Sequence, residues 1–275
     1  QPTLSGQIKE LEEKLGVELF ERTNKMVRLT PIGEKLTEKA RIILKDVDYF
    51  RDAATIAGKS LGGVIHLGVP PSLGPYILPY IIPIIHKEYP DLRLHISEAP
   101  PRELELGLDQ GKYDLLFTAT PTIMAELSYM TLFNEPLWVG LSAENELATL
   151  SKIEGHHLKG QKVITLGVGH QLFEQAQVIA SEYDCQIMSE YEGTSLDAVR
   201  HMVAMNMGLS FFPGLYAASE IKDSEEIKVL PFFKKSFKRS IGLAWRRTSP
   251  RIKDYHLIAN IINKELKDRF SDIIA

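Results

Sequence analysis

A long apolar stripe between residues 36 and 54 is the feature that most restricts the fold of this 275-residue chain. Its members are separated by four, three, four, three and four residues, which is coiled-coil spacing sustained for about three heptads. The stripe consists of Leu36, Ala40, Ile43, Val47, Phe50 and Ala54. We therefore predict a helix over residues 31–59 that pairs with a second copy in a homodimer or homotetramer. The alternative is an amphipathic helix packed on its own domain, but such a helix usually has a wider apolar face.

The segment before this helix predicts a small DNA-binding unit over residues 1–30. Apolar residues at positions 4, 8, 11 and 15 share one helix face, and Gly16 suits the end of that helix. Residues 21–31 then read as a tight turn between two very short strands, a small wing. The residues expected to face DNA are Gln1, Pro2, Thr3, Ser5, Gln7 and Lys9 on the helix, and Arg22, Lys25 and Arg28 on the wing. A solvated surface is the competing interpretation, because residues 1–30 hold as many acidic as basic side chains.

After the glycine-rich segment 58–63, strands alternate with helices. Strands are expected at residues 64–69, 92–98, 115–118, 137–141, 162–166, 209–212 and 240–245. One helix is expected to end near residue 89. Four more are expected at residues 102–110, 172–183, 195–207 and 250–270. This order is typical of an α/β fold with a mostly parallel sheet covered on both faces. We predict a two-lobed domain over residues 60–275, with lobe I at 60–133 and 240–275 and lobe II at 134–239.

Four loops at predicted strand ends carry hydroxyl groups or backbone amides. They lie at residues 72–75, 118–121, 169–171 and 193–195. Each loop alone is better explained as a helix cap, worth ~1 kcal/mol. Their shared position at strand ends nevertheless favours one common ligand cleft.

The composition excludes several classes of function. A net charge of −4 excludes a uniformly basic nucleic-acid coat, and the single cysteine, Cys185, excludes an intramolecular disulfide and a thiolate-rich metal site. No phosphate-binding loop, dinucleotide fingerprint or nucleophile–base set is found, so we expect neither an enzyme nor a cofactor or metal site. No apolar run reaches the ~18 residues of a membrane helix, and no export-signal pattern is present. We expect a cytoplasmic protein with no membrane partner, and one that lacks some residues upstream of Gln1.

The N-terminal segments closely resemble a known family of regulators. The sequences QPTLSGQIKELE at residues 1–12 and LGVELFER at residues 15–22 resemble the second half of a LysR-type winged helix-turn-helix. TPIG at residues 30–33 is similar to that family's entry to its dimerising linker helix. The resemblance implies a winged helix-turn-helix that is truncated at its N-terminus, a coiled-coil linker and a two-lobed regulatory domain like periplasmic binding proteins.

The resemblance extends to the OxyR branch of this family. It is carried by GPYILPYIIP at residues 74–83, by Gly169 and His170, by TSL at residues 194–196, and by IGL at residues 241–243. That branch senses hydrogen peroxide with a cysteine directly after the Gly-His pair and a second cysteine further along the same segment. The resemblance implies that Ser72, His170 and Arg239 lie near the position of that branch's peroxide pocket. Together with the strand-end loops, it predicts a sensor or effector cleft at Ser72, Thr118, Thr120, His170, Gln171, Thr194 and Arg239.

The chain departs from the branch at the decisive position, because Gln171 stands where the reactive cysteine is expected. An amide forms neither a thiolate nor a sulfenic acid. Both a natural loss of peroxide chemistry and an engineered substitution fit the sequence, and the Gln171 amide is expected to hydrogen-bond neighbouring loop amides. Cys185 is expected to be an inert structural thiol, with nearby carboxylates that raise its pKa.

We therefore predict an OxyR-like transcriptional activator that binds palindromic double-stranded DNA as a homo-oligomer, with RNA polymerase and a small-molecule effector as further partners. A link to oxidative-stress genes follows from the resemblance alone. The alternatives are a two-lobed regulator unrelated to peroxide, and a solute-binding protein or enzyme on the same fold. A solute-binding protein has no use for a heptad helix preceded by a wing.

Overall fold

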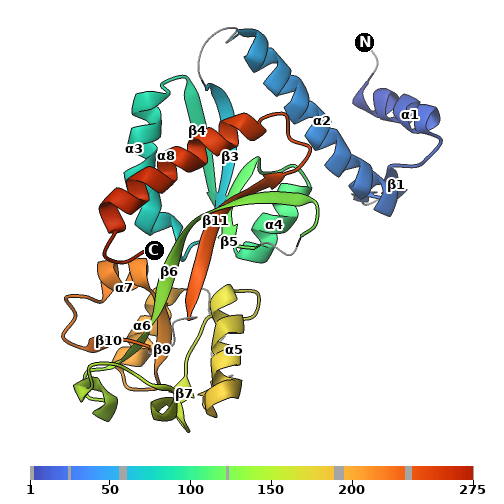
Figure 1. The fold of residues 1–275 in the computed structure, drawn as a ribbon. Helices are drawn as coiled ribbons and strands as arrows, with labels where there is room; N and C mark the ends of the chain where they lie inside the picture. The colour runs from blue at the N-terminus through green and yellow to red at the C-terminus, as the bar shows by residue number, and fades with distance from the viewer. Residues whose placement is uncertain are drawn as a thin grey trace. The chain divides into compact units, whose positions relative to one another are not determined.

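The computed structural model describes residues 3–23, 26–55, 61–121, 124–188, 195–232 and 237–274. The chain divides into two compact units, which are drawn in Figure 1. The first, here called the N-terminal unit, comprises residues 1–57 with the short segment 110–112. The second, the regulatory unit, comprises residues 58–109 and 113–275.

The N-terminal unit contains the predicted helix, wing and second helix. Its elements are α1 (Leu4–Leu15), β1 (Phe20–Thr23), β2 (Met26–Leu29) and α2 (Pro31–Thr55), and β1 pairs with β2 in antiparallel fashion. Gly16 ends α1 with a φ of 68°, a left-handed conformation that favours glycine. Thr30 precedes α2, and its hydroxyl accepts a hydrogen bond from the Gly33 N–H at 3.0 Å. The predicted first helix with Gly16 at its end, the two short strands and a second helix from residue 31 are confirmed. The turn residues 24–25 and residues 56–59 of the predicted second helix lie outside the described residues.

A seven-stranded sheet forms the framework of the regulatory unit as far as the structure describes it. The strand order is β10 (Ile227–Pro231), β6 (Leu127–Ser142), β11 (Lys238–Arg246), β5 (Leu115–Ala119), β3 (Gly63–Val69) and β4 (Leu92–Glu98), and β9 (Ser210–Pro213) also pairs with β6. Strand β3 is parallel to β4 and β5, whereas every other pair in this sheet is antiparallel. The prediction of a mostly parallel sheet is therefore wrong: the sheet is mixed.

Two lobes share this sheet through the strands β6 and β11, which run through both lobes in Figure 1. One lobe carries α3 (Gly74–Glu88), α4 (Pro101–Asp109) and α8 (Ile252–Phe270), and the other carries α5 (Gln171–Tyr183), α6 (Leu196–Ala204) and α7 (Gly214–Glu220). The buried hydrophobic residues form three clusters, one built from residues between 137 and 237 and two from the remaining segments, one of which Leu215 of α7 joins. The two-lobed α/β architecture is thus present, and the cores divide near the predicted lobe boundaries, which stay predictions.

Several predicted elements differ from the observed ones. Strand β6 begins at Leu127 rather than residue 137, strand β7 (Lys162–Val163) has two residues rather than five, and α6 ends at Ala204 rather than residue 207. The sequence analysis also missed α7, β10, β8 (Gln186–Ile187) and the short 3-10 helices η1 (Glu146–Thr149) and η2 (Gly155–Leu158). The first half of β6 was missed because Asn134, Glu135 and Pro136 are atypical of a strand interior.

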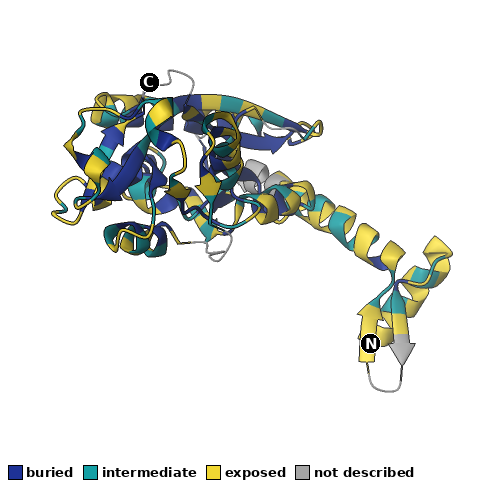
Figure 2. Cartoon of the chain, turned by 90° about the horizontal axis from the view of Figure 1, so that it is seen from below, coloured by how far each residue is buried: buried dark blue, intermediate teal, exposed yellow. Residues whose placement is uncertain are grey.

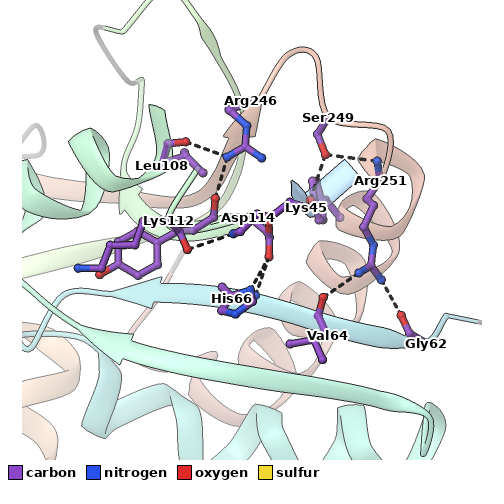
Figure 3. Close-up of polar contacts among 12 residues, drawn as sticks. Lys45, Gly62, Val64, His66, Leu108, Lys112, Asp114, Arg246, Ser249 and Arg251 are labelled. Carbon is purple, nitrogen blue, oxygen red and sulfur yellow. Dashed lines mark hydrogen bonds and ion pairs between the residues drawn. The ribbon is translucent and has the colours of Figure 1, made fainter. Parts of the chain in front are cut away.

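Two buried arginines bind backbone carbonyl oxygens in the regulatory unit (Figure 3). The Arg251 guanidinium donates hydrogen bonds to the carbonyl oxygens of Gly62 at 2.7 Å and Val64 at 2.9 Å. Arg246 donates to the carbonyls of Leu108 and Tyr113, both at 2.8 Å. The charge-assisted bonds of Arg251 fix the segment that enters β3, and those of Arg246 join the end of α4 to the residues before β5.

In the described part of the chain, no helix combines the length and the apolar character that crossing a membrane requires.

Candidate functional site

A pocket of about 530 Å³ opens at the ends of strands β3 and β5 in the regulatory unit. Its walls come from the loop after β3, from α4, from the end of β5, from the loop before α5 and from β11. Its volume lies in the range of small-molecule sites. Five residues that the sequence analysis assigned to one cleft line it together: Ser72, Thr118, His170, Gln171 and Arg239.

Two further residues of the predicted cleft are not part of this wall. Thr120 lies just beyond β5, but its hydroxyl pairs with the Thr131 hydroxyl at 2.9 Å, and it does not line the pocket. Thr194 lies outside the described residues. The predicted cleft is therefore reduced to five lining residues, which come from two loops, two strands and the first position of α5.

Arg239 is fixed by a buried ion pair at the back of the pocket. Its guanidinium donates Nε–H to Glu135, and both side chains are almost fully buried. Its other nitrogens donate to the Ser72 hydroxyl at 3.2 Å and the Ser72 carbonyl at 3.1 Å. The second Glu135 oxygen accepts the backbone N–H of Leu215 at 2.8 Å, in the first turn of α7. This network therefore joins the loop after β3, both shared strands and α7.

The start of α5 presents its N-cap residue, His170, and its first residue, Gln171, to the pocket. Gly169 has a φ of 92°, which requires a residue without a Cβ. His170 is 7% exposed, and burial lowers the pKa of its imidazole, so that the neutral ring is favoured near pH 7. Gln171 is half-buried, and the hydrogen bonds expected of its side chain are not found among the described residues. That expectation stays a prediction.

Acidic side chains on α4 and α5 complete the wall, and the sequence analysis missed them. Glu105 accepts a hydrogen bond from the Thr118 hydroxyl at 3.2 Å. Burial raises the pKa of Glu105, and the nearby Glu174 carboxylate raises it further, against the lowering effect of Thr118. Arg102 also lines the pocket. Because α4 and α5 are amphipathic, charged residues on them are expected at the surface, and nothing in the sequence separates these from other surface charges.

Cys185 lies away from the pocket lining, in the core of the lobe that carries α5. It is 9% exposed, and burial raises the pKa of its thiol, with a smaller contribution from the Asp184 carboxylate. The predicted direction of the shift is confirmed, but its main cause is burial rather than charge. A buried thiol with a raised pKa reacts slowly as a nucleophile.

The N-terminal unit leaves its predicted contact residues exposed. Thr3, Ser5, Gln7 and Lys9 on α1 and Arg28 on β2 are exposed, whereas Gln1, Pro2, Lys25 and the side chain of Arg22 lie outside the described part. On α2, Ile43 is 62% exposed, Val47 40% and Phe50 73%. Figure 2 shows this exposure as yellow along both helices. Leu36 is half-buried, Ala40 is exposed, and the side chain of Ala54 is not described.

Both units match families of known proteins. The family described as "LysR substrate binding domain" matches residues 58–266, and the one described as "Bacterial regulatory helix-turn-helix protein, lysR family" matches residues 1–34. The chain is 34% identical over 267 residues to a hydrogen peroxide-inducible genes activator of Haemophilus influenzae, covering 97% of this chain and 88% of that protein. It is 34% identical over 274 residues to the DNA-binding transcriptional dual regulator OxyR of Escherichia coli K12, covering 100% of this chain and 90% of that protein.

A solved structure shows the same arrangement of elements. The chain superposes on a full-length OxyR variant from Pseudomonas aeruginosa with a TM-score of 0.78 and 32% identity. The match covers 95% of this chain and 88% of that one. The similarity therefore extends over both units and is not limited to the regulatory fold.

Proposed function

The chain belongs to the LysR family of bacterial DNA-binding transcriptional regulators, in its OxyR branch, and we propose that a small molecule in the pocket controls it without a cysteine switch. Residues 1–30 would contact DNA, residues 31–59 would pair two copies, and residues 60–275 would sense the effector. The names of the relatives, among them a hydrogen peroxide-inducible genes activator, support a role as an activator of oxidative-stress genes. RNA polymerase is proposed as a partner because an activator acts on transcription.

We propose that α1 reads bases and that the wing contacts phosphates. The support is the exposure of Thr3, Ser5 and Gln7 along α1 and of Arg28 on the wing. Short polar side chains let a helix approach base edges, and a guanidinium suits a phosphate. Among the residues outside the described part, Gln1, Pro2, Arg22 and Lys25 are proposed to take part in the same contacts. A palindromic operator follows from a two-fold dimer.

The exposed stripe on α2 is proposed as the dimer seam. Ile43, Val47 and Phe50 expose large apolar surfaces at heptad spacing within a single chain. Burial of these side chains against a second copy removes apolar surface from water. A dimeric linker also provides the mechanical route from pocket to DNA, because it fixes the spacing of the two DNA-binding units.

The observation that carries the cysteine-free proposal is the separation of Cys185 from the pocket. The chain has one cysteine, and it lies in a hydrophobic core with a raised pKa. Gln171, which is proposed to occupy the position of the branch's reactive cysteine, opens α5 on the pocket wall. An effector then acts by binding two lobe arrangements unequally, since equal binding shifts no equilibrium.

The Gln171→Cys variant tests this assignment of position 171. We expect the variant, and not the parent, to gain 16 mass units per oxygen atom when treated with about one equivalent of peroxide, because a pocket thiolate is oxidised to a sulfenic acid. Intact-mass spectrometry with a sulfenate-trapping reagent measures it. Gln175→Cys, four residues along the same helix, is the control for a thiol outside the pocket lining. Equal oxidation of the two variants would contradict the assignment.

A further inference from the structure

We propose that the pocket of the regulatory unit binds a small organic cation through a primary ammonium group held between Glu105 and Glu174. This inference rests on the proposed function in that it names the class of effector for the same pocket. It depends on side chains that the family resemblance did not assign.

The two carboxylates approach the pocket from different lobes. Glu105 lies on α4 and Glu174 in the first turn of α5, and both line the pocket. Among the described residues neither of them forms an ion pair. Two like charges that face one cavity repel each other, and the charge of Glu174 contributes to the raised pKa of Glu105. A cation between them removes this repulsion and favours the arrangement that brings the lobes together.

The remaining polar groups of the wall suit an ammonium donor. His170 lines the pocket and is 7% exposed, so it is more than nine-tenths buried. Its ring forms no hydrogen bond with the described residues. As a neutral imidazole it offers one unprotonated nitrogen as an acceptor. The Gln171 side-chain carbonyl is a second acceptor on the same wall. An ammonium has three N–H donors and no acceptor, so these groups complement it.

An anion and a metal ion both fit less well. The two basic lining residues do not offset the acids, because Arg239 is already neutralised by Glu135 and Arg102 alone remains. The N-terminus of α5 would attract an anion, but Glu174 in its first turn already offsets that partial charge. In the described part of the chain, no three His, Cys, Asp or Glu side chains are placed to hold a metal ion.

The apolar part of the wall sets the shape of the rest of the ligand. The side chains that provide it are Leu73, Leu166, Val168, Leu172 and Ile241. They can bury an aliphatic stem of a few carbons, which removes apolar surface from water. The ligand class is therefore a short alkyl amine with a single ammonium group.

Ligand-observed saturation-transfer NMR on the full chain tests this inference with three isosteric probes. The probes are n-butylammonium, n-butanol and butyrate, at equal concentration and ionic strength. We expect n-butylammonium to bind roughly tenfold more tightly than either isostere, because only it makes charge-assisted bonds to the two carboxylates. We expect Glu105→Gln and Glu174→Gln each to weaken its binding by roughly tenfold.

Glu103→Gln is the matched control, since Glu103 lies on the same helix α4 outside the pocket lining. It removes the same charge and is expected to leave butylammonium binding unchanged. Thermal unfolding of each variant establishes that it is folded. Equal binding of the three probes, preference for butyrate, no binding of any probe, or equal weakening by Glu103→Gln and Glu105→Gln would overturn the inference.

A DNA-binding assay separates this inference from the proposed function. If n-butylammonium does not bind while the chain still binds a palindromic operator in gel shift, the ligand class is wrong and the regulator assignment stands. If the chain does not bind DNA but the amine binds through both carboxylates, the ligand class stands and the proposed DNA contacts fail.

Discussion

The two units of the chain place their apolar side chains in opposite environments. In its described residues, the regulatory unit contains a seven-stranded sheet and three clusters of buried hydrophobic side chains. In the N-terminal unit, α1 has no buried residue, and Leu4 and Phe50 are each 73% exposed. The regulatory unit therefore derives its stability from its own core, whereas the N-terminal unit leaves large apolar side chains exposed. Mutations in the two units are expected to produce different kinds of defect.

The largest effect on stability is expected from Glu135→Ala in the regulatory unit. The change leaves Arg239 as a buried, unpaired cation and removes the acceptor of the Leu215 N–H. Breaking a buried ion pair on one side costs about 3–5 kcal/mol of unfolding free energy. Urea unfolding followed by circular dichroism measures this loss.

Lys152→Ala is the control for that variant, because the Lys152–Glu154 ion pair is largely exposed. We expect it to lower the unfolding free energy by less than about 1 kcal/mol. If the two variants were equally stable, the Glu135–Arg239 pair would not be the anchor that joins the shared strands.

The next effect concerns association rather than folding. In the double variant Ile43→Asp with Val47→Asp, two charges enter the proposed seam of α2, where burial of an unpaired charge is strongly unfavourable. We expect monomers in light scattering and DNA affinity that is roughly a hundredfold weaker, since only one half-site is bound at a time. Unfolding of the regulatory unit should not change. Ile43→Leu with Val47→Ile keeps the apolar volume and is expected to preserve the dimer; a dimeric aspartate variant would place the seam elsewhere.

Elements with a regular apolar spacing were predictable from the sequence, whereas a strand whose buried charge is neutralised by a distant residue was not. The strand β4 at residues 92–98 and the helix α8 follow a clear pattern, because local apolar spacing and a proline near the start fix them. The first half of β6 was missed because Glu135 is unfavourable in a buried strand unless Arg239, more than a hundred residues away, neutralises it. The spacing of residues along the chain does not indicate such a long-range ion pair.

The sequence indicated where the pocket lies but not which charged side chains line it. The strand ends at Ser72 and Thr118 lie together because β3 and β5 are neighbours in one sheet. The loop with His170 reaches the pocket from the other lobe, after β7, which belongs to a separate two-stranded sheet. Glu105 and Glu174 were not predicted, since their facing arrangement depends on how α4 and α5 pack on different lobes. Topology therefore predicts where a site forms, and tertiary packing determines what it binds.

A smaller effect is expected from single contacts with DNA. Arg28→Ala should weaken binding to all sequences about equally, by several-fold, and reduce the slope of log affinity against log salt by roughly 0.9. Thr3→Ala should instead relax sequence preference with little change in that slope. Fluorescence anisotropy with a palindrome and a scrambled duplex at several salt concentrations distinguishes the two. Loss of specificity from Arg28→Ala alone would invert the proposed roles of wing and helix.

The smallest effect is a pH-dependent change in stability from Glu105→Gln. Burial raises the pKa of Glu105, so the folded regulatory unit binds this proton more tightly than the unfolded chain does. Parent stability therefore gains from this group as pH falls through the raised pKa, and loses that gain as pH rises. The glutamine variant should be slightly more stable than the parent at neutral pH, with the difference vanishing below the ordinary pKa of glutamate. Thermal melts from pH 4 to 8 measure it; a variant less stable at pH 7 would contradict the burial argument.

Peroxide treatment of the parent protein tests the cysteine-free account most directly. A two-electron peroxide switch needs an accessible thiolate and a second thiol to capture the sulfenic acid, and this chain has only the buried Cys185. The measurement is a DNA footprint on the operator before and after peroxide, with intact mass and non-reducing mobility from the same samples. The account predicts an unchanged footprint, mass and mobility at doses that oxidise a cysteine-bearing relative. A dose-dependent footprint change that dithiothreitol reverses, and that Cys185→Ser abolishes, would contradict it.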